Sequence, residues 1–179
     1  MRNEVFRTKW FTIFEETLQK PPEFKNQKYF ILDEGNGVII LPFTPKGKIL
    51  LVRQFRPALK KWTWELPSGS IEKNECPTEA AERELLEETG YECPSIEKIG
   101  SCSLASNRSS SIESIFLARD SQIKTDYKIC ESIEVGKFDI CQFKKLVLEG
   151  EFLQLTALGS LLLASWRDKT IPNIHSLES

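Results

Sequence analysis

Residues 69–91 have the sequence GSIEKNECPTEAAERELLEETGY, which predicts a loop followed by a short helix. Within it, Glu84, Glu87 and Glu88 stand at i, i+3 and i+4, so their carboxylates share one face of the helix. Like charges at this spacing cost roughly 0.2–0.5 kcal/mol per pair. One interpretation is an acidic face in solvent. The other is a metal site, because a hard divalent cation with oxygen ligands would offset the repulsion.

The ends and the apolar face of this helix can also be predicted. Pro77 suits the first helical turn, and Gly90 suits the position just past the last one. Ala81 and Leu85 mark an adjacent apolar face that can pack on a sheet. Cys76 stands where Ser, Thr or Asp would cap the helix through a side-chain oxygen, so we expect a weak cap, at a cost of about 1 kcal/mol.

The composition limits the class of protein. With 179 residues, 40% of them hydrophobic, the chain suits one domain, or one domain with a small appendage. A formal net charge of -2 argues against nucleic-acid binding, for which we would expect a basic face. We expect neither a signal peptide nor a membrane-spanning segment, because every apolar run is short. Five cysteines without a C-x-x-C pair indicate reduced thiols, so the chain is predicted to be cytoplasmic, with no membrane partner.

The histidine count limits the chemistry. The chain has one histidine, His175, in its polar C-terminal segment. A Ser-His-Asp or Cys-His mechanism, or a zinc site rich in histidine, therefore has no source of ligands or bases. If the chain is a hydrolase, carboxylates and a metal ion must carry the reaction.

The rest of the chain predicts an α+β fold. Residues 1–35 should be extended, with strands at FTIFEETLQ and KYFILDE. VIILPF and KILLVRQF follow as buried strands joined by the hairpin turn TPKG, and RPALKKWTWELPS is predicted to be a loop. Beyond the central helix, SIEKIGSCSLA, SIESIFLARD and ESIEVGKFDI predict strands, whereas FDICQFKKLVLEG and TALGSLLLASWRD predict helices.

The segment 69–91 resembles the sequence motif of a known family. Its positions match the Nudix box in residue type and spacing at Gly69, Glu75, Arg83-Glu84-Leu85, Glu87-Glu88 and Gly90-Tyr91. The resemblance implies the Nudix fold, a mixed β-sheet sandwiched between α-helices, over residues 36–179, after an antiparallel strand extension at residues 1–35. It implies an Mg²⁺-dependent hydrolase, with Mn²⁺ as a substitute, that acts on a nucleoside diphosphate linked to another group. It also implies that Glu75 and Arg83 pair to fix the loop against the helix.

The same resemblance implies a set of metal ligands. In Nudix hydrolases the positions of Glu84 and Glu88 are the principal ligands, and the position of Glu87 contributes in part. The backbone carbonyl just before the box glycine, here that of Ser68, is a further ligand. Hydrolysis of a diphosphate needs such a cation, because the attacked phosphorus is surrounded by negative oxygens.

The flanks LLVRQFRP and WELPSG resemble the ADP-ribose pyrophosphatase and nucleoside diphosphate-sugar hydrolase branch of the family. In that branch the arginine before the proline of QFRP, here Arg56, reaches the diphosphate, for which its charge and fork geometry suit it. Glu65 matches a carboxylate close to the site. We expect Arg53, earlier on the same strand, to point to the same side as Arg56; the alternative is a solvated arginine.

The branch also implies a dimer. Its members often exchange N-terminal strands, and aromatic side chains there stack on the base across the dimer. Trp10 and Tyr29 lie in the corresponding part of this chain, with ordinary sheet packing as the alternative for both. We therefore expect a homodimer held partly by residues 1–35, because an apolar, strand-like opening would otherwise leave exposed edges. The expected small-molecule partner is a nucleotide sugar.

One loop departs from the branch pattern. ADP-ribose hydrolases usually carry a proline in the loop after the box, whereas the corresponding stretch here is Ala105-Ser106-Asn107. Arg108, which follows it, is a candidate for contacting a different sugar or phosphate. ADP-ribose and hexose-linked nucleotides such as ADP-glucose or GDP-mannose all remain candidate substrates. The alternatives are a hydrolase of nucleoside triphosphates or dinucleotide polyphosphates, and a non-catalytic module that senses a nucleotide sugar.

The base that activates water is predicted to be a carboxylate, because His175 lies in the tail. Related ADP-ribose hydrolases place a glutamate on the loop before a strand of the pattern D/E-x-I-x-V. Glu131, followed by Ser132-Ile133-Glu134-Val135, matches that position. Glu113 in the SIESIFLA strand is the alternative, and Glu88 acting alone is a third.

Overall fold

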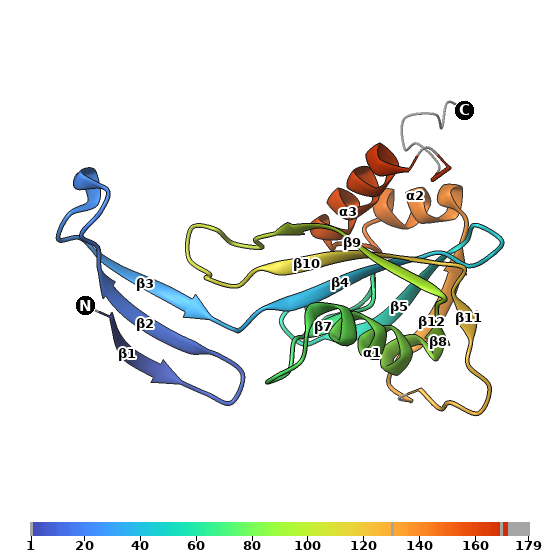
Figure 1. Ribbon diagram of the computed structural model, residues 1–179, viewed down its shortest axis with the longest axis horizontal. Helices are drawn as coiled ribbons and strands as arrows, with labels where there is room; N and C mark the ends of the chain where they lie inside the picture. Colours follow the sequence, from blue (N-terminus) through green and yellow to red (C-terminus); the bar gives the residue numbers. More distant parts are fainter. Residues whose placement is uncertain (1, 130, 169, 172–179) are drawn as a thin grey trace.

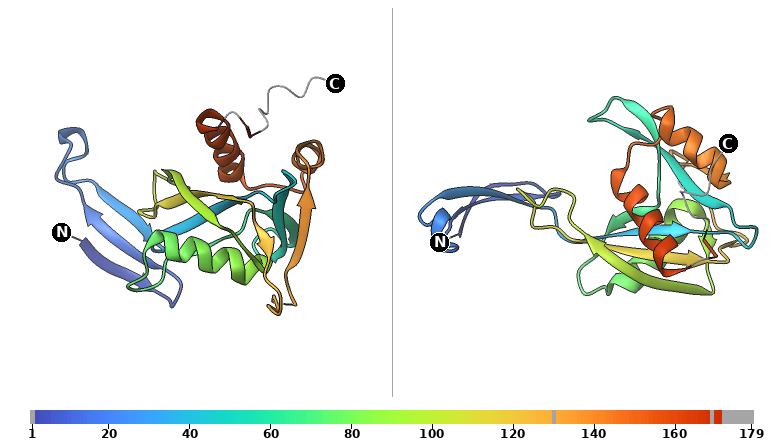
Figure 2. Two further views of the ribbon diagram at one scale, coloured as in Figure 1. Left: turned by 45° about the vertical axis from the view of Figure 1, so that its right-hand side comes forward. Right: turned by 90° about the horizontal axis from the view of Figure 1, so that it is seen from above.

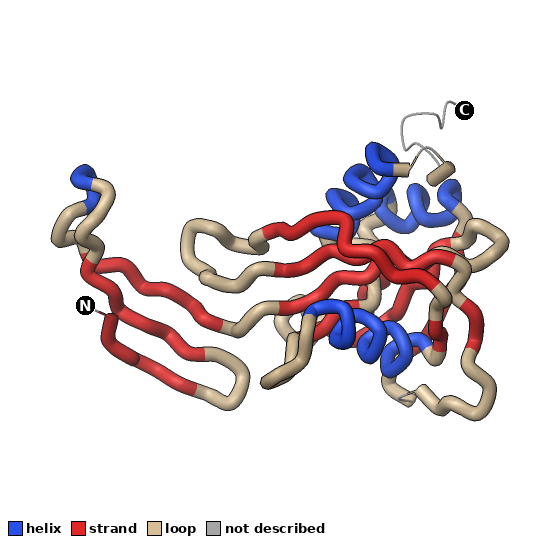
Figure 3. Tube along the Cα trace, in the orientation of Figure 1, coloured by secondary structure: helices blue, strands red, loops and turns tan. Residues whose placement is uncertain are grey.

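The computed structural model describes residues 2–129, 131–168 and 170–171. Its elements are, in order, β1 (Arg2–Arg7), β2 (Thr12–Thr17), β3 (Lys28–Asp33), β4 (Gly37–Pro42), β5 (Ile49–Arg56), β6 (Lys61–Glu65), β7 (Ser68–Ser70), α1 (Pro77–Thr89), β8 (Tyr91–Glu92), β9 (Ser95–Cys102), β10 (Glu113–Arg119), β11 (Gln122–Ile123), β12 (Glu134–Phe138), α2 (Ile140–Leu148) and α3 (Leu155–Arg167). A mixture of sheets and helices is evident in Figure 3, and the predicted α+β class is confirmed.

Two sheets form the middle layer of the molecule. One has the order β7-β4-β10-β9, in which β4 and β10 run parallel and the other neighbours run antiparallel. The other, with the order β12-β5-β6, is antiparallel. Helix α1 packs on one side of this layer, and α2 and α3 lie on the other (Figure 1). The predicted arrangement of a mixed sheet between helices is therefore confirmed.

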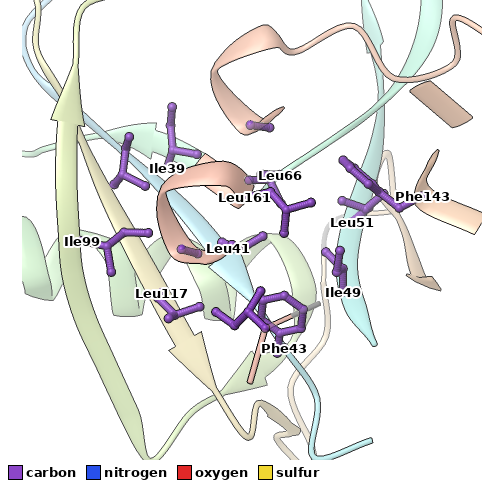
Figure 4. Packing of buried hydrophobic residues seen from close by; sticks show 14 of the residues in the cluster. Ile39, Leu41, Phe43, Ile49, Leu51, Leu66, Ile99, Leu117, Phe143 and Leu161 are labelled. Atoms are coloured by element: carbon purple, nitrogen blue, oxygen red, sulfur yellow. The ribbon is translucent and has the colours of Figure 1, made fainter. Parts of the chain in front are cut away.

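The core has two parts, separated by strand β4. Val38 and Ile40 pack in the cluster that includes the buried residues of α1. Ile39 and Leu41 belong to the larger cluster, which includes Leu161 of α3 (Figure 4). All four are buried, which explains why VIILPF is a continuous apolar run rather than an alternating one. Strand β4, buried on both faces, contacts the box helix and pairs with the neighbouring edge strand β7.

Helix α1 has the predicted ends and apolar face. It starts at Pro77, and Gly90 follows its last turn with a φ of 72°, in the left-handed region that favours glycine. Ala81 and Leu85 are fully buried against the sheet layer.

No helix in the described part of the chain is long and apolar enough to cross a membrane.

The cap of α1 differs from the prediction of a weak one. Cys76 Sγ accepts a long hydrogen bond from the backbone N–H of Glu79, at 3.5 Å. The Glu79 carboxylate in turn accepts one from the backbone N–H of Cys76, at 2.8 Å. This reciprocal capping box satisfies two N–H groups of the first turn. The prediction considered only the cap residue and overlooked the glutamate three positions later.

The segment predicted to be a loop before the box contains a strand, so that prediction is wrong. Strand β6 pairs with β5, and its side chains alternate. Thr63 and Glu65 are buried on one face, and Trp62 and Trp64 lie on the other. The alternation of KWTWE was visible in the sequence, but its lysines and polar residues suggested a solvated loop.

The turn TPKG forms as predicted but does not lead into a continuous hairpin. The backbone N–H of Thr44 donates to the carbonyl of Lys48 at 2.9 Å, and a single bridge joins Phe43 to Ile49. Beyond the bridge, β4 enters one sheet and β5 enters the other.

Strands β1, β2 and β3 form a separate antiparallel sheet that projects from the other sheets (Figure 2). The predicted strands in FTIFEETLQ and KYFILDE are confirmed as β2 and β3. The backbone of Leu32 anchors the sheet, donating to Arg108 O at 2.8 Å and accepting from Ser110 N at 3.0 Å. Large apolar side chains are nevertheless exposed on it, namely Val5, Phe6, Trp10 and Phe30.

Candidate active site

Helix α1 and the edge strand β7 meet at the box glycine. A Cβ at Gly69 would overlap the carboxylate of Glu84, so only a glycine permits this approach. Glu88 is held from two sides: Oε2 accepts a hydrogen bond from the backbone N–H of Ser68 at 2.9 Å, and Oε1 accepts one from Gln54 Nε2 at 2.6 Å. The structure therefore brings together Ser68, Glu84 and Glu88, three of the four predicted metal ligands.

The two carboxylates carry charge that their surroundings compensate only in part. Burial raises the pKa of Glu84, and it raises the pKa of Glu88 to about 7 in spite of two hydrogen bonds. Carboxylate oxygens are the ligands that a hard divalent cation prefers, and such a cation would balance the charge of Glu84 and Glu88. Glu87 differs, because its side chain is 51% exposed. Among the described residues, no three Asp, Glu, His or Cys side chains form a group that could hold a metal ion. Glu84 and Glu88 are the box carboxylates that lie beside the backbone of β7.

Arg83 connects the box loop to the helix. Its guanidinium donates two hydrogen bonds to Glu75, at 2.7 and 2.9 Å, and one to the carbonyl of Ser70 at 3.0 Å. The predicted pair of Glu75 and Arg83 is thus confirmed, and these bonds lower the pKa of Glu75 to about 2. One guanidinium nitrogen of Arg83 also donates to Glu84 at 2.7 Å and to Glu87 at 3.2 Å, so it bridges these two carboxylates.

One face of β5 presents polar side chains to the box. Arg56 Nε donates to Glu65 Oε1 at 2.8 Å, and a second guanidinium nitrogen donates to the other carboxylate oxygen. Burial alone would raise the pKa of Glu65, but hydrogen bonds from Arg56 and Thr63 lower it instead. Gln54, two residues before Arg56, shares this face and contacts Glu88. The sequence interpretation missed Gln54, although the spacing within QFR indicates its direction.

Arg53 lies on the opposite face of β5, so the expectation that it points to the same side as Arg56 is wrong. It precedes Arg56 by three residues, and side chains of a regular strand alternate. One of its guanidinium nitrogens contacts Glu134 at 3.3 Å. Its guanidinium carbon lies 5.9 Å from the ring centroids of both Trp62 and Trp64.

The two candidate bases lie in different pockets. Glu131 is exposed on the loop before β12, where it lines a pocket of about 270 Å³ with Arg53 and Trp62. Glu113, the first residue of β10, is half-buried over Gly37. In the described part of the chain, no hydrogen bond joins either carboxylate to the box glutamates.

Glu113 lines a larger pocket, of about 460 Å³, beside the box. Ser68, Gly69 and Ser70 form one wall, and the opposite walls come from the segment after β3, the loop before β10 and the start of α3. The pocket holds two carboxylates, those of Glu34 and Glu113, and no described lysine or arginine lines it. Burial, followed by the charge of Glu34, raises the pKa of Glu113.

The predicted base-stacking residues lie on the N-terminal sheet. Trp10, in the turn between β1 and β2, is 72% exposed, and Lys9 Nζ lies 4.4 Å from its ring centroid. Tyr29 on β3 lines a pocket of about 490 Å³ together with Arg108. Within one chain, the structure does not join these side chains to the box. His175 lies outside the described residues.

Comparisons with known proteins agree with this fold. Residues 33–154 match the family model of the NUDIX domain. The ADP-ribose pyrophosphatase of Bacillus subtilis (strain 168) is 32% identical over 149 residues, which is 82% of this chain and 80% of the relative. The GDP-mannose pyrophosphatase of Yersinia enterocolitica is 27% identical over 146 residues, 75% of this chain and 74% of the relative.

A crystal structure of an ADP compounds hydrolase has the same fold, with a TM-score of 0.80 and 21% sequence identity. The similarity covers 95% of this chain and 92% of that one. The fold and the box therefore define a hydrolase of the α+β class that is built around a carboxylate-bearing helix. This chain belongs to the Nudix family. Within it, the chain is related to ADP-ribose and nucleotide-sugar pyrophosphatases.

Proposed function

We propose that this protein hydrolyses the diphosphate bond of a nucleoside diphosphate sugar, to a nucleoside monophosphate and a sugar phosphate, in an Mg²⁺-dependent reaction. The observation that carries the proposal is the placement of Arg56 beside the box. Its guanidinium is oriented by buried Glu65 and shares a strand face with Gln54, which contacts Glu88. The positively charged guanidinium of Arg56 is thereby held next to the box carboxylates. There it can donate charge-assisted hydrogen bonds to the diphosphate of a substrate.

The residues that would hold Mg²⁺, or Mn²⁺ in its place, are Glu84, Glu88 and the carbonyl of Ser68, with Glu87 as a contributor. When bound, the cation supplies charge neutralisation at the diphosphate and a water of lowered pKa. The chain's own residues bind and orient the substrate. Arg56 donates to the diphosphate oxygens, and Glu65 keeps the fork of that arginine in place. We assign Glu131 the role of general base, which accepts the proton of the attacking water.

The pocket beside the box favours a sugar over additional phosphates. Carboxylates accept hydrogen bonds, so Glu34 and Glu113 suit the hydroxyl groups of a sugar. A triphosphate or polyphosphate tail would meet negative charge there without a described lysine or arginine to offset it. This supports a nucleotide sugar over the alternative substrates. The names of the relatives above support the same class, which includes both ADP-ribose and hexose-linked nucleotides.

We further propose that residues 1–35 form a dimerisation element ahead of the Nudix domain at residues 36–179. Support comes from the exposed apolar side chains on the N-terminal sheet. In such a dimer Trp10 and Tyr29 would contact the base bound by the partner subunit. We also place the protein in the cytoplasm, since Cys76, Cys93, Cys102 and Cys141 are free thiols.

The test is product release from a substrate panel. Purified protein with Mg²⁺ is incubated with ADP-ribose, ADP-glucose, GDP-mannose, ATP and a diadenosine polyphosphate, and the products are separated by chromatography. We expect nucleoside monophosphate from at least one nucleotide sugar, loss of turnover with EDTA, and recovery when Mg²⁺ is restored. Turnover of ATP or the dinucleotide alone, or of no substrate, would contradict the proposal.

The general base is tested by comparing Glu131→Gln with Glu113→Gln. We expect the first to lower kcat by on the order of 10²–10⁴-fold, as for loss of a general base, with little change in Mg²⁺ affinity. The second should act mainly on KM for the nucleotide sugar. A fully active Glu131→Gln beside an inactive Glu113→Gln would assign the base to Glu113.

A further inference from the structure

Gln54 lies on the face of β5 that is directed toward α1. Leu50, four residues earlier on the same regularly paired strand, is buried in the cluster that contains Leu85 of α1. Side chains of a regular strand alternate, so Leu50 and Gln54 point to the same side of the sheet. The contact between β5 and α1 is therefore apolar at Leu50 and becomes polar at half-buried Gln54, which contacts Glu88 at 2.6 Å.

The carboxylate of Glu88 has a hydrogen-bond donor on each of its oxygens. Nε2 of Gln54 donates to Oε1, and the backbone N–H of Ser68, on strand β7, donates to Oε2 at 2.9 Å. A single hydrogen bond would let the carboxylate rotate about its last bond, whereas two donors from different strands fix its plane. Each carboxylate oxygen has two lone pairs, so one on each oxygen is left for a cation.

Glu88 differs from the other two box glutamates in the charge of its partners. Glu84 and Glu87 both accept hydrogen bonds from the guanidinium of Arg83. In the described part of the chain, Glu88 accepts hydrogen bonds only from neutral groups, an amide side chain and a backbone N–H. An arginine at position 54 would compete with a metal ion for the carboxylate, because charge-assisted hydrogen bonds are the stronger ones. A neutral amide orients the carboxylate and leaves its charge to be balanced by a cation.

We propose that Gln54 is a positioning residue that orients the carboxylate of Glu88 for a divalent cation without competing for its charge. Glu88 is a ligand of Mg²⁺ in the proposed function, on which this inference rests. Packing alone does not require an amide here, because β5 uses apolar Leu50 where it only packs against α1. Arg56 differs from Gln54 in its role, since its guanidinium is held by Glu65 and is assigned to the diphosphate. Gln54 therefore acts on cation binding, and Arg56 acts on substrate binding.

The test is Mn²⁺ binding, measured without substrate from the electron paramagnetic resonance signal of the free ion. Gln54→Met keeps the length of the side chain and removes the donor, whereas Gln54→Asn keeps the amide but is too short to reach Glu88. We expect both variants to raise the Mn²⁺ dissociation constant by about 10–100-fold, the usual effect of removing a group that orients a metal ligand. Gln122→Met is the matched control, because it removes an exposed glutamine on another strand, β11.

Steady-state kinetics separates positioning from substrate binding. In both variants the Mg²⁺ concentration for half-maximal turnover should rise by a similar factor, whereas KM for the nucleotide sugar at saturating Mg²⁺ should stay within about twofold. A wild-type Mn²⁺ affinity in either variant, no Mn²⁺ binding by the wild-type protein, or a loss confined to KM would overturn the inference. Should Gln54→Met not fold by circular dichroism, Gln54→Asn carries the test. If the wild-type protein hydrolyses no nucleotide sugar, the proposed function fails, and the Mn²⁺ measurement still decides the role of Gln54.

Discussion

The box and the N-terminal sheet differ in how their side chains are held. At the box, each predicted site residue on α1 meets a partner within the chain: Glu88 contacts Ser68 and Gln54, and Arg83 contacts Glu84. On the N-terminal sheet, by contrast, every residue of β1 is exposed, and Trp10 extends into solvent. The difference indicates that the first region is organised by the chain itself. The second presents a surface that suits a partner, which we propose is a second copy.

The largest effect is expected at the centre of the box. Glu88→Gln should lower kcat by at least about 100-fold, because even indirect contacts to a metal ion are worth about 10–100-fold. Its thermal midpoint should not fall, since the substitution removes a buried charge and a like-charge neighbour. Glu82→Gln, an exposed charge on the same helix, is the control. Near wild-type turnover of Glu88→Gln at saturating Mg²⁺ would remove this carboxylate from the site.

The next effect tests the face of β5 that is directed toward α1 and carries Gln54 and Arg56. Arg56→Ala should raise KM by about 10–100-fold, because a charge-assisted hydrogen bond to the diphosphate is lost. Lys61→Ala is the control: Lys61 is paired with Arg56 on β6, but its ammonium contacts the carbonyl of Gly150. Steady-state kinetics on the best nucleotide sugar gives the comparison. An unchanged KM for Arg56→Ala would show that the box works without this arginine.

A smaller effect, on assembly, tests the N-terminal sheet. We expect the protein to be a dimer by light scattering at micromolar concentration, and Phe30→Glu to weaken it by about tenfold or more, as for an apolar interface residue. Gln27→Glu adds the same charge in the turn before β3 and should leave the dimer intact. A monomeric wild-type protein would contradict the dimer and would also exclude stacking by Trp10 in trans.

The smallest effect concerns the link between the box loop and the helix. Arg83 lowers the pKa of Glu75 from an ordinary 4.5 to about 2. The ionised Glu75 therefore stabilises the folded state fully above pH 4.5, and this stabilisation is lost as the pH falls through 2. Glu75→Gln should therefore lower the thermal midpoint by a few degrees at most at pH 7, and the difference should shrink toward pH 2. Thermal melts across this range, with Glu82→Gln as the control, measure it. An equal difference at pH 7 and pH 2 would argue against the ion pair.

Local relations within the box helix could be predicted from the amino-acid sequence alone. The helix ends at Pro77 and Gly90 and the shared face of the three box glutamates follow from spacing within the helix, whereas the pairing of Glu75 with Arg83 was implied by the resemblance to the Nudix box. A helix repeats every 3.6 residues whatever surrounds it, so these relations hold before any tertiary contact forms. The family pattern then supplied the fold, because the box and its flanks have fixed positions in it.

Relations between distant segments depend on how the strands and helices pack together. The alternation of KWTWE was visible in the sequence, but its pairing with β5 was not. The regularity of β5, which directs Arg53 away from the face of Arg56, follows from its pairing with β6 and β12. Gln54 meets Glu88, and Glu113 enters a pocket beside the box, only because separate strands and α1 pack together. Such contacts depend on packing between segments far apart in the chain, and hydrophobic periodicity carries no information about that packing.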